Sequence, residues 1–150
     1  MAYFLEVTLD KFTFRVATDR RYTREGLWVA EAGTGRVRIG LTDFLQQHSG
    51  DAAFVRVRPA GTGLKVGDDL AELETIKVNQ VLASPVGGTI VAANPELDLS
   101  PEIVNQSPYD QGWILEVETA SWDADRAALL DPDAYFAVMK AQAEQELKEP

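Results

Sequence analysis

The segment Leu70-Ala71-Glu72-Leu73-Glu74-Thr75-Ile76-Lys77-Val78-Asn79-Gln80-Val81-Leu82 has the pattern of a strand, a turn and a second strand. Apolar and polar residues alternate before Lys77, which is typical of a half-buried strand. A lysine at or beside such a turn projects from the body of the protein, where a modifying enzyme can reach its amine. From the turn alone, however, an ordinary solvated lysine is the simpler interpretation.

Short runs with the same two-residue period dominate the first two thirds of the chain. Glycine, proline or asparagine separates them, a pattern that favours a barrel or sandwich over a parallel α/β sheet. We therefore predict a mainly β fold. The expected strands are residues 3–8, 12–16, 27–30, 36–40, 53–58, 69–74, 79–82, 89–93 and 114–118.

Helices are expected only as short connections and at the C-terminal end. Their starts are marked by side chains that accept a hydrogen bond from the first helical turn: Thr42, Ser100 before Pro101, and Asp131 before Pro132. In the segment that follows Asp131, apolar residues recur at helical spacing. The expected helices are one from Thr42 to near Gly50, one from Ser100, one or two turns within residues 122–130, and the longest over residues 131–147.

The bulk composition bounds the class of protein. With 150 residues and 45% hydrophobic content, the chain suits one domain over residues 1–150, with residues 1–20 as an N-terminal extension. The net charge of −10 argues against nucleic acid and anionic membrane as partners. We find neither a signal peptide nor an apolar run near about 18 residues, and expect a cytoplasmic protein without a membrane span.

No residue set predicts catalysis or metal binding. The chain has no cysteine, so any thiol chemistry must arrive with a cofactor. His48 is the only histidine, which excludes a histidine triad or a multi-histidine metal site within one chain. We expect it to be a partly exposed side chain at a helix end. Acidic pairs such as Asp68-Asp69 lack the glycine and terminal glutamate of a calcium loop.

A family resemblance changes the interpretation of Lys77. The segment Glu74-Thr75-Ile76-Lys77, followed eight residues later by Pro85-Val86-Gly87-Gly88, resembles the lipoyl attachment segment of the glycine cleavage system H protein. The segment Asn105-Gln106-Ser107-Pro108-Tyr109-Asp110-Gln111-Gly112-Trp113 is similar to an H-protein motif that ordinary lipoyl domains lack. With Gly40-Leu41-Thr42-Asp43-Phe44-Leu45-Gln46-Gln47, the resemblance runs collinearly from about Tyr22 to Met139.

The resemblance implies a lipoyl-type hammerhead, which is a flattened antiparallel β-barrel or sandwich. It implies a lipoate covalently attached to Lys77, with Glu74, Ile76 and Val78 helping to present that lysine to a lipoate ligase or lipoyl transferase. The protein would then be a carrier and not an enzyme. Its partners would be glycine decarboxylase, aminomethyltransferase and dihydrolipoyl dehydrogenase, between which it carries an aminomethyl intermediate and reducing equivalents.

One departure leaves the cargo open. Where H proteins usually have Tyr-Thr-x-Glu-His-Glu-Trp-Val, Gly26 and Leu27 replace the histidine and the second glutamate, so a polar feature of the cleft is expected to be missing. H-like lipoate-binding proteins that carry sulfur intermediates for a heterodisulfide-reductase-like complex are therefore an alternative. An unmodified H-like interaction module is another. Biotin carriage is disfavoured, because Ile76-Lys77-Val78 stands where a Met-Lys-Met tip is expected.

Overall fold

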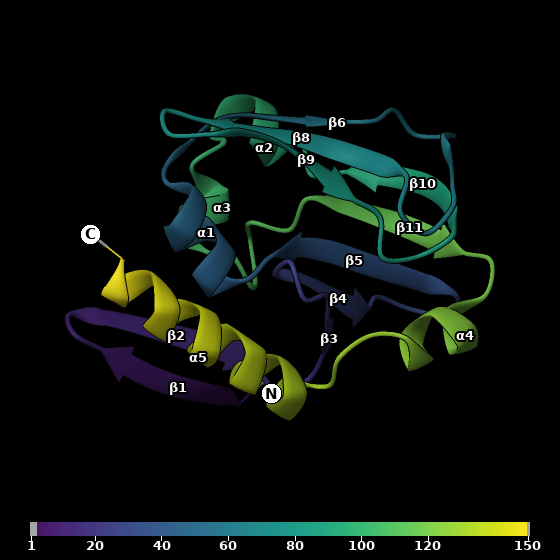
Figure 1. Ribbon diagram of the computed structural model, residues 1–150. Helices are drawn as coiled ribbons and strands as arrows, with labels where there is room; N and C mark the ends of the chain where they lie inside the picture. The colour runs from purple at the N-terminus through teal and green to yellow at the C-terminus, as the bar shows by residue number, and fades with distance from the viewer. Residues whose placement is uncertain (1–2, 150) are drawn as a thin grey trace.

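The computed structural model describes residues 3–149, so the outermost ends of the predicted 1–150 domain and 1–20 extension lie outside it. Its strands pair antiparallel and form three sheets (Figure 1). This confirms the predicted mainly β class. The sheets are open, and the described strands do not close into a barrel.

The first sheet is a hairpin of β1 (Phe4–Leu9) and β2 (Phe12–Ala17). The six-stranded sheet has the order β3 (Arg21–Tyr22), β4 (Leu27–Glu31), β5 (Arg36–Leu41), β11 (Leu115–Thr119), β10 (Gly88–Ala93) and β7 (Gly63–Leu64). The third sheet has the order β6 (Ala52–Val57), β8 (Asp69–Thr75) and β9 (Asn79–Ala83). The helices are α1 (Asp43–Ser49), α2 (Glu96–Leu99), α3 (Ile103–Gln106), α4 (Trp122–Ala127) and α5 (Pro132–Lys148).

The main hydrophobic core lies between the six-stranded and three-stranded sheets (Figure 1). Within β8, Leu73 is buried in this core whereas the next residue, Glu74, is partly exposed, as expected for a strand with one face on a core. Each fully buried aliphatic side chain contributes roughly 1.5–3 kcal/mol. That burial sets the strand register, in which Glu74 pairs with Asn79 and residues 75–78 form the hairpin tip.

A second hydrophobic cluster joins the N-terminal hairpin and α5 to the β3–β4 end of the six-stranded sheet. The rings of Tyr22 and Tyr135 stack with their centroids 4.7 Å apart. The hydroxyl of Tyr22 donates to the carbonyl of Ala17, and the hydroxyl of Tyr135 lies 3.0 Å from that of Thr42. Segments from both ends of the chain are therefore held on one side of the sheet. The buried members are Phe14, Val16, Tyr22, Trp28, Phe44, Tyr135, Met139 and Ala143.

The helix starts at Thr42 and Asp131 are confirmed. The hydroxyl of Thr42 accepts an N–H of the first turn of α1 at 3.2 Å, and Gly50 ends that helix with φ at +90°. The carboxylate of Asp131 accepts an N–H of the first turn of α5 at 2.8 Å. α5 matches the predicted 131–147 within one residue, and α4 lies within 122–130. None of the helices described is both long and apolar enough to span a membrane.

The predicted helix start at Ser100 is wrong. Ser100 is the C-cap of α2, and α3 begins after Glu102, whose side chain makes no capping bond. The helical region starts earlier, because the side-chain oxygen of Asn94 accepts the N–H of Glu96 at 3.1 Å. The strands β3 and β7 were also absent from the prediction, since two residues are too few to show a period.

The stacked tyrosines predict a loss of stability in alkali. Burial raises the pKa of Tyr22, and raises that of Tyr135 to about 12, because a phenolate would lose its hydration inside the cluster. In the unfolded chain a tyrosine ionises near about pH 10. The free energy of unfolding therefore keeps this contribution in full below about pH 10. It falls as the pH rises toward the pKa values of the tyrosines in the folded protein, by about 1.4 kcal/mol per pH unit for each such tyrosine.

Urea unfolding of the wild type and of Tyr135→Phe at several pH values between about 9 and 11 measures this slope. The variant should lose free energy of unfolding less steeply with pH than the wild type, because one buried phenol is gone. Equal slopes in the two proteins would contradict the burial of the Tyr135 hydroxyl.

Candidate functional site

Lys77 lies at the tip of the β8–β9 hairpin, as predicted. Ile76 beside it is 96% exposed, and Lys77 is exposed as well. The turn is closed by a hydrogen bond of 2.8 Å from the N–H of Thr75 to the carbonyl of Val78. The amine is therefore carried by a short loop outside the main core.

Thr75 holds this tip in one conformation. Its hydroxyl oxygen accepts the N–H groups of Lys77 at 3.1 Å and Val78 at 2.9 Å, and its hydroxyl donates to the carbonyl of Ser49 at 2.8 Å. The residue is only 7% exposed. Threonine hydroxyls commonly bond the backbone two residues onward, so the sequence did carry a signal for this role that the prediction missed. One side chain thus fixes the turn and ties it to the end of α1.

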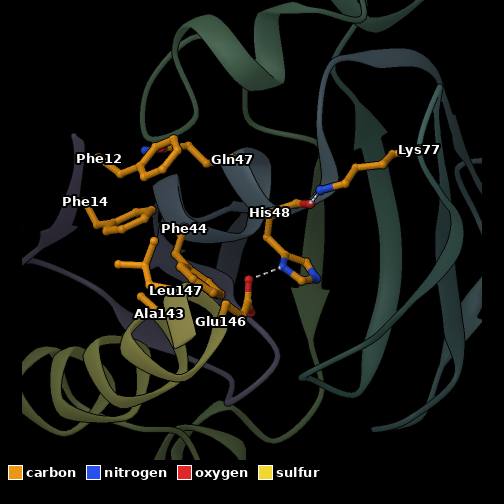
Figure 2. Close-up of a pocket in the computed structure, with 9 residues that line it drawn as sticks. All are labelled: Phe12, Phe14, Phe44, Gln47, His48, Lys77, Ala143, Glu146 and Leu147. Atoms are coloured by element: carbon orange, nitrogen blue, oxygen red, sulfur yellow. Dashed lines mark hydrogen bonds and ion pairs between the residues drawn. The ribbon is translucent and has the colours of Figure 1, made fainter. Parts of the chain in front are cut away.

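The side chain of Lys77 folds back toward the body of the protein, where a projecting side chain was expected. Its amine donates to the carbonyl of His48 at 3.1 Å, at the C-terminal end of α1 (Figure 2). Carbonyls at a helix C-terminus attract a cation. A Cβ at Gly50 would lie 3.8 Å from the Cβ and Cδ atoms of Lys77, so the aliphatic stem passes close to this backbone.

His48 is a helix-end residue with a partly exposed side chain, as predicted. Its Nδ1 lies 2.8 Å from a carboxylate oxygen of Glu146 on α5, and its ring stacks on that of Phe44 with centroids 5.8 Å apart (Figure 2). Its side chain is 41% exposed. The ring therefore joins α1 to α5, while its backbone carbonyl contacts Lys77.

The other predicted site residues divide between the tip and the strand. Val78 is partly buried and takes part in the turn through its backbone. Glu74 lies on the outer face of the three-stranded sheet, paired with Phe54 on β6 and Asn79 on β9. Only Ile76 shares the exposed tip with Lys77.

A distant motif supports the loop beneath the tip. The side-chain oxygen of Asn105 accepts the N–H of Ala52 at 2.9 Å, and its amide donates to the carbonyl of Gly50 at 2.9 Å and to the side chain of Gln46 at 3.1 Å. Asn105 is partly buried, so these bonds are shielded from much of the solvent. Asn105 thus holds the connection between α1 and β6, next to the carbonyl of Ser49 to which Thr75 donates.

Two glycines of the motifs after the hairpin are required by close backbone contacts. Gly88 has φ at +152°, and a Cβ there would overlap the carbonyl oxygen of Glu118 on the neighbouring strand. A Cβ at Gly112 would likewise overlap the carbonyl oxygen of Ile103. These motif glycines allow close approach of two backbones, and they act on the fold and not on the lysine directly.

The Gly26-Leu27 departure has a structural basis. Gly26 has φ at +103°, and a Cβ there would meet the Cβ of Leu45 at 3.0 Å and the hydroxyl of Thr42 at 3.1 Å. Leu27 is 3% exposed and belongs to the main core. Together with Thr23, Glu25, Leu45 and residues 80–83 of β9, Leu27 lines a cavity of about 200 Å³. Where the family pattern has a histidine and a glutamate, this chain therefore has a tight turn and a core side chain.

Comparison with known proteins places these features in a family context. The family model described as Glycine cleavage H-protein matches residues 20–142. A glycine cleavage system H protein of Mycobacterium avium (strain 104) is 40% identical over 123 residues, covering 80% of this chain and 93% of that protein. One from Salinibacter ruber (strain DSM 13855 / M31) is 42% identical over 120 residues, covering 80% and 95%.

A solved structure extends the comparison to the fold. The crystal structure of a glycine cleavage system H protein from Mycobacterium marinum matches with a TM-score of 0.71 and 28% identity, over 80% of this chain and 95% of that chain. Residues before 20 and after 142 lie outside the match to the family model. The N-terminal hairpin and the end of α5 belong to those outer segments.

Replacing Thr75 by valine should loosen the tip without changing its size. The N–H groups of Lys77 and Val78 would lose their acceptor, and we expect the free energy of unfolding to fall by about 1–3 kcal/mol. Hydrogen exchange at these two amides should become faster. Urea unfolding and amide exchange followed by NMR measure the two effects.

Two further variants serve as controls. Thr75→Ser keeps the hydroxyl and should retain slow exchange at Lys77 and Val78. Thr89→Val removes a hydroxyl from an exposed position of β10 and should leave both measurements near the wild-type values. If Thr75→Val exchanged no faster than Thr89→Val, the hydroxyl would not be what holds the turn.

Proposed function

The chain belongs to the glycine cleavage H-protein family, and from this premise we propose that it is a carrier whose Lys77 bears a covalent lipoyl arm. The observation that supports the proposal best is the position of Lys77 at an exposed tip whose backbone is held independently by Thr75. The amine can move while the turn keeps its shape. A carrier needs this separation between a mobile side chain and a fixed body.

The residues at the tip fit such a modification. The only hydrogen bond of the Lys77 amine within residues 3–149 is the exposed one to the carbonyl of His48, and none of the carboxylates described there pairs with it. An amide nitrogen on the same side chain would keep one N–H for that carbonyl. Attachment therefore removes a charge without breaking an ion pair or exposing a buried group.

The residues next to Lys77 would have different roles in a carrier. The exposed side chain of Ile76, with Glu74 on the adjoining strand face, offers a lipoate ligase or lipoyl transferase a surface to recognise. Val78 completes the turn. A bound lipoyl group supplies thiol–disulfide chemistry, which a chain without cysteine lacks. The protein itself holds and presents the arm and has no catalytic residue of its own.

We propose glycine decarboxylase, aminomethyltransferase and dihydrolipoyl dehydrogenase as the partner enzymes, with an aminomethyl group as cargo. Family membership supports this set. The net charge of −10 suits docking to basic surfaces on such partners.

Lipoylation at Lys77 is tested by intact-mass measurement after co-expression with a lipoate ligase. We expect one lipoyl increment in the wild type and none in Lys77→Arg, which keeps the charge but offers no primary amine. Lys65→Arg, at an exposed position near the other end of β8, is the matched control and should be modified like the wild type. A wild type that gains no mass under these conditions would overturn the carrier proposal.

A second candidate keeps the arm and changes the cargo. The family pattern of histidine and glutamate is replaced here by Gly26, whose backbone conformation disfavours a side chain, and by the buried Leu27. At the cavity that Leu27 lines, an aliphatic side chain therefore stands where the family pattern has a glutamate. An H-like carrier of sulfur intermediates for a heterodisulfide-reductase-like complex needs no such group.

The two cargoes are separated by offering the lipoylated protein to glycine decarboxylase with labelled bicarbonate and glycine. Glycine cleavage function predicts exchange of label into glycine, at a rate that falls to background with Lys77→Arg. A lipoylated H protein of known activity serves as the positive control. Label exchange in that control but not with this protein would favour the sulfur cargo.

A further inference from the structure

A cavity of about 240 Å³ opens directly beside Lys77, between the N-terminal hairpin, α1 and the last turns of α5 (Figure 2). Aromatic rings of β2 and α1 line one side of it. Ring centroids are 6.4 Å apart for Phe12 and Phe14, 5.5 Å for Phe14 and Phe44, and 5.8 Å for Phe44 and His48. The row of rings ends at His48, whose carbonyl accepts the amine of Lys77.

Much of this lining comes from segments outside the family match. Phe12 and Phe14 precede residue 20, and Leu147 follows residue 142. The contact of 2.8 Å between Nδ1 of His48 and a carboxylate oxygen of Glu146 joins the end of α5 to α1 at the edge of this cavity. The cavity thus lies where these outer segments meet α1 and the proposed attachment residue.

The apolar surface at the cavity is incompletely covered. Phe12 is 41% exposed and Leu147 is 44% exposed, whereas Phe14 and Phe44 are buried. Two apolar side chains at the cavity are therefore available to contact a bound apolar group. The volume is below the roughly 300–1,000 Å³ of pockets for drug-sized ligands, so it suits a small ring with part of a chain.

The chemistry of the lining matches a dithiolane. A lipoyl arm is an apolar chain that ends in a five-membered ring with two sulfur atoms, and sulfur makes favourable contacts with aromatic rings. The first atom of the arm is the nitrogen of Lys77, which already lies at the cavity. A tethered group also reaches the cavity at high effective concentration, so weak contacts are enough to hold it.

We infer that this cavity is a resting site for the dithiolane of the arm on Lys77, in which the ring lies against Phe12, Phe14 and Phe44 between visits to partner enzymes. The inference rests on the proposed lipoylation. It assigns a function to the N-terminal hairpin and to the end of α5. The cavity is separate from the one beside Leu27, on which the choice of cargo depends.

The test uses the full chain after lipoylation has been verified by intact mass. The dithiolane is reduced with a water-soluble phosphine, and the rate is followed by loss of its near-ultraviolet absorbance. We expect the Phe12→Ser variant to be reduced roughly threefold to tenfold faster than the wild type, the factor for losing one aromatic contact to sulfur. Phe4→Ser is the matched control, since Phe4 is 45% exposed on the same hairpin but does not line this cavity.

A second measurement, by NMR, locates the dithiolane directly. In the wild type, NMR cross-relaxation between dithiolane protons and the ring protons of Phe14 or Phe44 is expected, and it should weaken in Phe12→Ser but not in Phe4→Ser. Equal reduction rates in the wild type and Phe12→Ser, or equal acceleration by Phe4→Ser, would overturn the inference while leaving lipoylation intact. A dimer that dissociates in Phe12→Ser would assign the cavity to a second copy of the chain and also overturn it. If the wild type did not gain the lipoyl mass, that result would contradict the proposed function and this inference together.

Discussion

The hydroxyl of Thr75 is the constraint on which the geometry of the site depends. It accepts two backbone N–H groups of the turn and donates to the carbonyl at the end of α1, all from a buried position. An unmatched polar group there would cost about 1–3 kcal/mol. The exposed bond from Lys77 to His48 contributes about 1 kcal/mol or less. The backbone of the tip is therefore held more strongly than the lysine side chain, and it stays in place when that side chain moves away from His48.

The rest of the fold serves to hold the backbone beneath that tip. Asn105 fixes the connection between α1 and β6, and Thr42 starts α1 while its hydroxyl also contacts Tyr135 of α5. The main core sets the register of β8 and β9 from one side, and the tyrosine cluster holds α5 from the other. α1 lies between these two regions, and its last carbonyls meet both Thr75 and Lys77.

The chain departs from the family pattern in two separate places. Gly26 and Leu27 replace polar residues with a tight turn and a core side chain, next to one cavity. The N-terminal hairpin and the end of α5 add an aromatic cavity next to the amine. Of the two cavities, only the aromatic one is lined by Lys77, and the tip itself keeps the family motif. The departures therefore lie outside the Lys77 tip.

The sequence by itself determined the mainly β class, the hairpin with Lys77 at its tip, and the caps at Thr42 and Asp131, because these depend on local periods and on side chains that bond their own neighbours. The helix start predicted at Ser100 rested on a local pattern too, and it was wrong. The side chain of Asn94 bonds the N–H of Glu96, so the helical region starts earlier, with α2. Only the tertiary structure decided that the amine of Lys77 bonds the carbonyl of His48. It also decided that the N-terminal hairpin and the last turns of α5 meet beside this lysine. Those contacts join residues far apart in the chain, and packing of the two hydrophobic clusters, not any local pattern, brings them together.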